Sequence, residues 1–192
     1  MIKAIIFDCF GVLVTEGWIT FRDRHFAEGA PRQQATDLRR AADRGVLAYS
    51  EFEQKIAEMA DVPRKMVRDS LQGNIPNEPL LEYIRTTLKP GYKIGVLSNA
   101  ATDVMERLFT PEQRQLFDAT ILSYHIQTAK PDPQAYLAIT DKLGVEPKDC
   151  VFVDDSEYFC MAAREQGMRV VCYQDFTQAK AELDTLLADP KN

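Results

Sequence analysis

Polar side chains that can do chemistry stand where four predicted strands or turns end. They comprise single acidic and basic groups, a hydroxyl beside an amide, and an adjacent acidic pair. The residues are Asp8 in FDCFGVLV, Ser98 and Asn99 in GVLSNA, Lys130 in AKPDP, and Asp154 with Asp155 in VFVDDS. Each alone has an ordinary explanation as a turn or surface residue. Together they suggest a reaction centre.

Carboxylates dominate this set. Three of them at one edge of a parallel sheet repel one another, and folding avoids that arrangement unless a cation neutralises them. Mg²⁺ is a hard ion that prefers carboxylate, carbonyl and water oxygens. A carboxylate attacks phosphorus only when the two anions are screened, and Mg²⁺ with Lys130 would supply that screening, while Ser98 holds phosphate oxygens. We therefore predict metal-assisted chemistry at a phosphate group.

The order of these segments resembles the haloacid dehalogenase superfamily over essentially the whole chain. The resemblance implies a hydrolase in which Asp8 is the nucleophile and forms an aspartyl intermediate. It also implies that Ser98 and Lys130 bind phosphate, with Asn99 as a secondary contact. A small phosphorylated metabolite is the expected substrate.

The same resemblance implies a Mg²⁺ site. Its expected ligands are the side chains of Asp8, Asp154 and Asp155 and the backbone carbonyl of Phe10. Phosphatases of the superfamily carry a second Asp at the Phe10 position, which protonates the leaving group and then activates water. Losing that acid costs roughly 10²- to 10⁴-fold in rate, so hydrolysis should be slow or limited to reactive esters such as acyl phosphates.

Phe10 also raises two other hypotheses. Relatives that cleave carbon-halogen bonds often have an aromatic residue there and need no metal, although they typically lack the acidic pair. Arg39 and Arg40 would then be halide or anion contacts, but arginines on a charged helix face are more often solvated. The second alternative is a non-catalytic protein that binds a phosphorylated ligand or a protein partner.

Several other residues have weaker functional interpretations. Phosphonate-cleaving relatives use a lysine from the helical insert, for which Lys55 and Lys65 qualify only by location. Phe159 stands where relatives often have Asn or Asp and is interpreted as core packing. His25 and His125 have no partner at a metal or triad spacing, so serine-hydrolase chemistry is unsupported.

The fold needed to position the site is α/β. Short apolar runs predict buried parallel strands, and helical patterns lie between them. One helix is expected over 132–143, with Asp132 as N-cap and Gly144 as its stop, and another over 157–166 between Ser156 and Gly167. The predicted strands are 3–7, 93–97, 119–122, 150–154 and 169–173. This pattern predicts a doubly wound, Rossmann-like core.

Residues 15–75 differ from the rest because they offer helical segments and no convincing strand. Ser50 and Glu53 have the spacing of a capping box, and Phe52, Ile56 and Met59 follow on one helix face. We expect a core domain over 1–14 and 76–192 and a helical cap domain over 15–75, as in many members of the superfamily.

The composition argues against several other classes of protein. The 192 residues are 45% hydrophobic and 27% charged, which is ordinary for a globular protein. A net charge of -6 argues against nucleic-acid binding, and no apolar run has the length of a membrane span or a signal segment. Cysteines at 9, 150, 160 and 172 lack metal spacing, so we expect buried free thiols and a reducing cytoplasm.

Overall fold

The computed structural model describes residues 1–15, 17–43, 46–100 and 103–188. The chain forms two compact units. One consists of Met1–Val14 and Pro76–Asn192, and the other of Thr15–Ile75. None of the helices in the described parts of the chain is long and apolar enough to cross a membrane.

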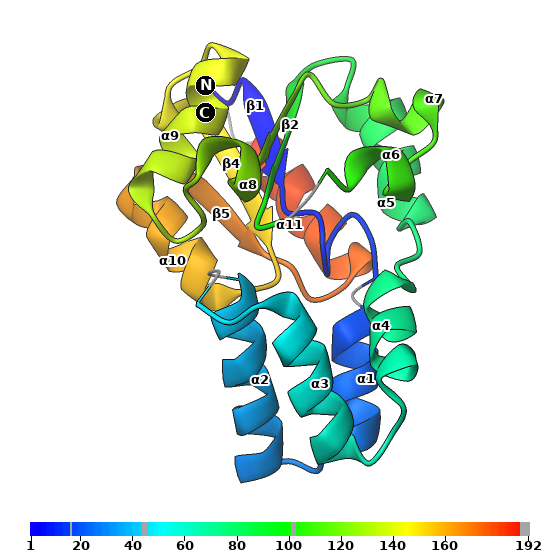
Figure 1. The fold of residues 1–192 in the computed structure, drawn as a ribbon. Helices are drawn as coiled ribbons and strands as arrows, with labels where there is room; N and C mark the ends of the chain where they lie inside the picture. The colour runs from blue at the N-terminus through cyan, green and yellow to red at the C-terminus, as the bar shows by residue number, and fades with distance from the viewer. Residues whose placement is uncertain (16, 44–45, 101–102, 189–192) are drawn as a thin grey trace. The chain divides into compact units, whose positions relative to one another are not determined.

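A five-stranded parallel sheet forms the centre of the first unit (Figure 1). Its strands are β1 (Ala4–Phe7), β2 (Lys93–Ser98), β3 (Ala119–Leu122), β4 (Cys150–Asp154) and β5 (Arg169–Cys172). They lie in the order β3-β2-β1-β4-β5, so the chain moves outward from β1 on one side and then returns to its other side. The predicted α/β, Rossmann-like fold is confirmed. Ligands of such sheets bind beyond the carboxyl ends of the strands, where the strand order reverses.

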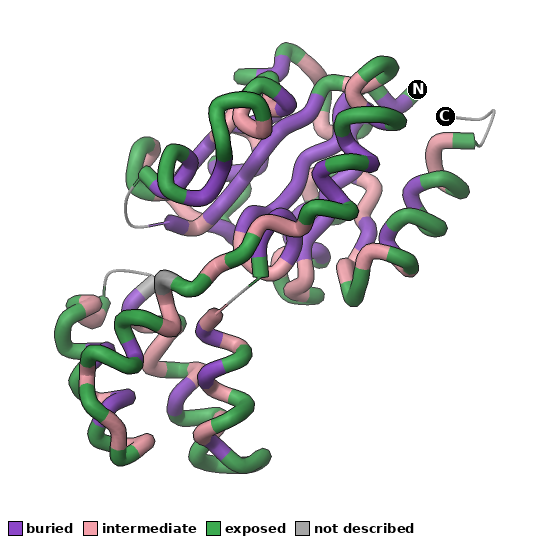
Figure 2. The backbone as a smooth tube through the Cα atoms, turned by 90° about the vertical axis from the view of Figure 1, so that its right-hand side faces the viewer, coloured by how far each residue is buried: buried purple, intermediate pink, exposed green. Residues whose placement is uncertain are grey.

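Helices cover both faces of this sheet, which explains the continuous apolar runs (Figure 2). Ile5 and Phe7 belong to the core that includes helices α5 (Glu78–Tyr83), η1 (Ile84–Leu88) and α11 (Phe176–Ala188). Ala4 and Ile6 belong to the opposite core, with α9 (Pro133–Leu143) and α10 (Glu157–Glu165). The shorter helices are α6 (Met105–Leu108), α7 (Pro111–Arg114), α8 (Ser123–Ile126) and η2 (Pro147–Asp149).

The ends of α9 follow the sequence signals. The Asp132 side chain accepts a hydrogen bond from the Gln134 backbone N–H, and Gly144 takes the left-handed conformation that ends the helix. Ser156 precedes α10 as expected, but its side chain makes no capping hydrogen bond. Its backbone N–H instead donates to Asp154 Oδ1 at 2.8 Å.

The described residues of the second unit form four helices: α1 (Gly17–His25), α2 (Ala30–Asp43), α3 (Tyr49–Ala60) and α4 (Arg64–Gln72). Phe52 and Ile56 are fully buried in its core and Met59 is partly buried, as the pattern predicted. Trp18 packs edge-to-face on Phe52, with ring centroids 5.3 Å apart. This unit therefore has a hydrophobic core of its own.

The predicted capping box at Ser50 and Glu53 is wrong. Helix α3 begins at Tyr49, with Ala48 as its N-cap and no capping by a side chain. Ser50 thus lies within the first turn, two positions after the N-cap, and cannot cap the helix. The Glu53 carboxylate accepts hydrogen bonds from Arg64 and Arg68 of α4, each at 2.9 Å. Glu53 therefore links α3 to α4 and does not cap the N-terminus of α3.

Two antiparallel segments connect the units. The Thr15 N–H donates to the Ile75 carbonyl at 2.8 Å, and the Ile75 N–H donates to the Thr15 hydroxyl at 2.8 Å. A Cβ atom on Gly17 would lie 1.9 Å from the Ser70 carbonyl oxygen, so only glycine fits this close approach.

Candidate active site

The candidate side chains gather at the carboxyl edge of the sheet. Asp8 follows the last residue of β1, while Ser98 and Asp154 are the last residues of β2 and β4. Strand β1 pairs with β2 on one side and with β4 on the other, which aligns these three ends. Lys130 comes from the loop between α8 and α9.

Lys130 is the centre of the cluster. Its ammonium nitrogen lies 2.8 Å from Asp8 Oδ1 and 2.6 Å from Asp154 Oδ2, and the residue is only 3% exposed. Burial alone would lower the pKa of Lys130, but the charges and hydrogen bonds of Asp154 and Asp8 outweigh it and raise the pKa. Lys130 therefore remains a buried cation between two carboxylates.

Asp8 has one oxygen engaged and one available. Oδ1 accepts hydrogen bonds from Lys130 and, at 2.7 Å, from the Cys9 backbone N–H. Oδ2 accepts none from any residue that the structure describes. Burial raises the pKa of Asp8, and the charges of Asp154 and Asp155 add to that effect while Lys130 opposes it. A carboxylate oriented through one oxygen presents the other as a nucleophile.

Asp155 completes a group of three carboxylates. Oxygen atoms of Asp8, Asp154 and Asp155 all lie within 4.8 Å of one another. Burial, with the charge of Asp154, raises the pKa of Asp155 to about 6. Gly11 makes room for this side chain, because a Cβ there would lie 2.3 Å from Asp155 Oδ2 and the backbone has a φ of +87°.

The Ser98 hydroxyl is buried and has no hydrogen-bond partner among the residues that the structure describes. Buried polar atoms are nearly always paired, and leaving one unpaired costs about 1–3 kcal/mol. Ser98 ends β2 beside the strand that leads to Asp8. The unpaired hydroxyl suits a ligand oxygen, and its binding of phosphate stays a prediction.

Asn99 is engaged by the backbone of Lys130. Its Nδ2 donates to the Lys130 carbonyl at 3.0 Å, and its Oδ1 accepts from the Lys130 N–H at 2.8 Å. This reciprocal pair holds the loop that delivers the ammonium group. Direct substrate contact by Asn99 stays a prediction, and positioning of Lys130 is the role its bonds support.

Aromatic rings surround the cation. The Lys130 nitrogen lies 4.9 Å from the centroid of Phe159 and 5.5 Å from that of Phe152. Such contacts stabilise a desolvated ammonium group electrostatically. Phe159 does pack against the core, as interpreted from the sequence. It also contacts the Lys130 ammonium group, a contact that the sequence interpretation missed.

Phe10 contributes two different groups. Its ring is half-buried against the core that contains Ile5 and Phe7. Its carbonyl oxygen accepts no hydrogen bond from the described residues, so it is open to a cation.

Comparison with known proteins decides the family. The family model for haloacid dehalogenase-like hydrolases matches residues 2–167. This chain belongs to the haloacid dehalogenase-like hydrolases. It is 32% identical over 189 residues to a protein named phosphatase MT3486 from Mycobacterium tuberculosis, covering 88% of this chain and 85% of that protein.

Solved structures agree with this family assignment. A family enzyme from Bacteroides thetaiotaomicron, solved in complex with magnesium and inorganic phosphate, superposes with a TM-score of 0.62 at 25% identity. The match covers 92% of this chain and 98% of that one. The L-2-haloacid dehalogenase from Xanthobacter autotrophicus shares the fold, with a TM-score of 0.66, 22% identity and coverage of 100% and 86%.

The carboxylates of this hydrolase fit a hard divalent cation. With Lys130 charged, three ionised carboxylates leave two negative charges in excess within a buried cluster. Hard oxygen ligands of this kind suit Mg²⁺. The Phe10 carbonyl, two residues after Asp8, accepts no hydrogen bond from the described residues. The three carboxylates expected as ligands therefore lie together, and their binding of Mg²⁺ stays a prediction.

The basic residues proposed for the helical insert have partners within that unit. Lys55 pairs with Glu51 and Lys65 with Asp69, each four residues away. The guanidinium of Arg40 lies 3.5 Å from Asp37, and Arg39 lies over the Tyr49 ring. These contacts support the interpretation of a charged helix surface.

The two histidines contact neighbouring rings. His25 stacks on Phe21, with centroids 4.3 Å apart, and His125 lies 3.9 Å from Tyr124. Neither contact resembles a catalytic triad. The prediction of buried free thiols at all four cysteines is confirmed for Cys9, Cys150 and Cys160, whereas Cys172 is free but only half-buried.

Proposed function

We propose that this hydrolase is a Mg²⁺-dependent phosphatase for a small phosphorylated metabolite and that it acts through an aspartyl phosphate at Asp8. The observation that carries the proposal is the buried Lys130 between Asp8 and Asp154. An ammonium group in this position orients the nucleophile and attracts an anionic substrate. The likeness to a protein named as a phosphatase supports the same activity.

The chain's own groups account for the first step. Lys130 holds Asp8 through Oδ1, and Oδ2 attacks phosphorus. The bond between phosphorus and the leaving oxygen breaks, and its electron pair departs with that oxygen. The Ser98 hydroxyl donates to a phosphate oxygen and thereby gains the partner it lacks. Bound Mg²⁺, held by the three carboxylates and the Phe10 carbonyl, would neutralise phosphate charge.

The second step lacks a protein base at position 10. Water attacks phosphorus of the aspartyl phosphate, releasing inorganic phosphate and restoring Asp8. The Phe10 side chain neither donates a proton to the leaving oxygen nor accepts one from this water. Both protons must come from or go to solvent, so substrates with good leaving groups should react fastest.

Turnover measurements test this proposal. Acetyl phosphate and an aryl phosphate are assayed with and without Mg²⁺, and Asp8→Asn serves as the variant that keeps shape but loses the nucleophile. We expect Mg²⁺-dependent phosphate release that falls at least 10³-fold in Asp8→Asn. Activity that is indifferent to Asp8→Asn would refute the nucleophilic role.

Metal-independent dehalogenation of a 2-haloacid is the second candidate. The aromatic residue at position 10 favours it, whereas Asp154 and Asp155 favour a metal. Halide release from 2-chloropropionate without Mg²⁺ would select the dehalogenase. Binding of phosphate without any turnover would select the third hypothesis, a non-catalytic phospholigand-binding protein.

A further inference from the structure

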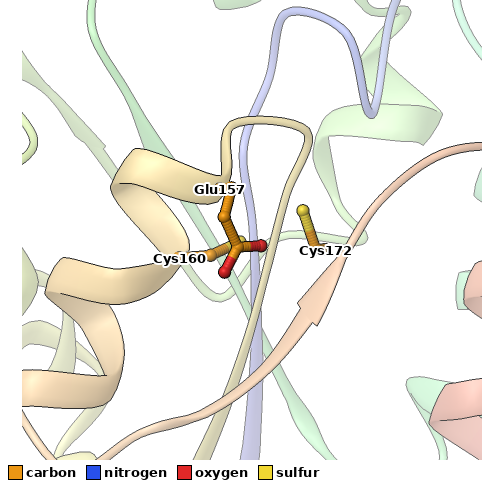
Figure 3. Close-up of side chains that lie close together, drawn as sticks. All are labelled: Glu157, Cys160 and Cys172. Carbon is orange, nitrogen blue, oxygen red and sulfur yellow. The ribbon is translucent and has the colours of Figure 1, made fainter.

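A second group of ligand-type side chains lies beside the active site but shares no residue with it. Glu157, Cys160 and Cys172 each offer one atom, and the three atoms lie within 4.8 Å of one another. Figure 3 shows Glu157 and Cys160 on one side of the group and Cys172 at the end of the neighbouring strand. No step of the phosphatase mechanism uses these residues.

The fold itself brings the three together. Glu157 and Cys160 are one turn apart on α10 and therefore share a face of that helix. Cys172 is the last residue of β5, paired in register with Asp154 of β4. Helix α10 packs on β5, so the site joins two elements and not one flexible loop.

The ligand types select a soft cation. Thiolate ligands favour Zn²⁺ and its chemical relatives over Mg²⁺. Zinc bonds to sulfur and carboxylate oxygen are about 2.0–2.3 Å long, which places tetrahedral ligand atoms roughly 3.3–3.8 Å apart. Side-chain movements of about 1 Å would close the group around an ion.

Arg164 lies beside this group of side chains and contacts Glu157. Arg164 donates to Glu157 Oε1 at 2.7 Å, which orients the carboxylate and places a positive charge beside it. Cys160 is buried, but Cys172 is half-buried and Glu157 is exposed, so an ion can reach the group from solvent. Two thiolates and one carboxylate carry one negative charge more than the ion, and Arg164 offsets it.

We propose that Glu157, Cys160 and Cys172 form a binding site for a thiophilic divalent cation of the zinc class. Both thiol protons leave to solvent as the two metal–sulfur bonds form. Cys160 gives up its weak contact with the Asp154 carbonyl oxygen, at 3.4 Å, in exchange. The bound ion ties α10 to β5 and stabilises the unit that carries the catalytic residues.

Cobalt binding tests the proposal. The reduced protein is kept in excess Mg²⁺, which occupies the carboxylate cluster, and is titrated with Co²⁺. We expect a thiolate-to-cobalt charge-transfer band that saturates at one ion per chain, is displaced by Zn²⁺, and accompanies a rise in Tm.

Matched variants assign the band to this site. Cys172→Ser should abolish it, and Glu157→Gln, an exposed position that leaves the fold intact, should weaken Co²⁺ binding about 10-fold. Cys150→Ser removes a thiol elsewhere and Asp155→Asn alters the carboxylate cluster, so both should retain the band. Absence of the band in the wild-type protein, or an undiminished band in Cys172→Ser, would overturn the proposal.

Discussion

Position 10 carries an aromatic ring where related phosphatases carry a second aspartate. Replacing Phe10 with Asp should restore proton transfer to the leaving oxygen and raise kcat on an alkyl phosphate by roughly 10²- to 10⁴-fold. Acetyl phosphate, whose leaving group needs no proton, should gain little. Steady-state phosphate release from both substrates measures this difference.

Phe10→Asn is the matched control, because it has the same shape as Asp and cannot act as an acid. It should leave the alkyl phosphate rate near that of the wild-type protein. An equal gain in both variants would mean that relief of steric bulk, and not proton transfer, limits the reaction.

Lys130 is a further test at the residue scale. Lys130→Met keeps most of the apolar stem but leaves Asp8 and Asp154 buried without their common cation. Breaking a buried ion pair in this way costs about 3–5 kcal/mol. We therefore expect a lower free energy of unfolding without metal, measured by denaturant titration, and a larger stabilisation by Mg²⁺ than in the wild-type protein. Equal stabilisation of the two proteins by Mg²⁺ would place the ion elsewhere.

Helices α3 and α4 are linked by the Glu53 carboxylate, which accepts hydrogen bonds from Arg64 and Arg68. Burial alone would raise the pKa of Glu53, but hydrogen bonds and charges of Arg68 and Arg64 outweigh it and lower the pKa. The ion pairs of Glu53 therefore stabilise the folded state at pH values above the pKa that Glu53 has in the unfolded chain. This stabilisation is lost as pH falls through the lower pKa of Glu53 in the folded protein.

Glu53→Gln should destabilise the helical unit by about 1–2 kcal/mol at neutral pH, since both arginines are partly exposed to solvent. Amide hydrogen exchange in α3 and α4 measures the change. Glu51→Gln, which removes only a surface pair with Lys55, is the control and should have little effect. Equal exchange in the wild-type protein and Glu53→Gln would contradict the proposed link.

Sequence patterns predicted the strands well because each buries both faces and so reads as an unbroken apolar run. The carboxyl edge of a parallel sheet then brings Asp8, Ser98 and Asp154 together without further information. The position of the Lys130 amine was harder to predict, since it depends on a loop held by Asn99. Glu53 was misassigned because its partners, Arg64 and Arg68, lie 11 and 15 residues away, whereas a capping box is a local signal.

For the whole molecule, the buried acidic cluster links pH, metal and stability. The pKa of Asp155 is raised to about 6 in the folded protein, from an ordinary value of 3.8. The contribution of protonated Asp155 to the free energy of unfolding is therefore fully present below about pH 3.8 and is lost as pH rises through about 6. Relative to Asp155→Asn, the metal-free protein should lose stability between these two values. Parallel unfolding curves across pH 4–7 measure the difference, and a constant difference would contradict the assigned shift.

Mg²⁺ should oppose this loss of stability at higher pH. The ion binds the ionised cluster, so its stabilising effect should grow as pH rises through about 6. The rise in Tm on adding Mg²⁺ at pH 5 and at pH 7.5 tests the linkage. A rise that is the same at both values would show that the ion does not bind these carboxylates.

Phosphatase action through Asp8 passes through a covalent intermediate, and the missing acid at position 10 should let that intermediate accumulate. The protein is mixed with radiolabelled acetyl phosphate and Mg²⁺, quenched in acid and assayed for protein-bound phosphate that hydroxylamine releases. We expect label on the wild-type chain and none on Asp8→Asn. Equal labelling of the two proteins, or phosphate release without any labelled intermediate, would contradict nucleophilic catalysis by Asp8.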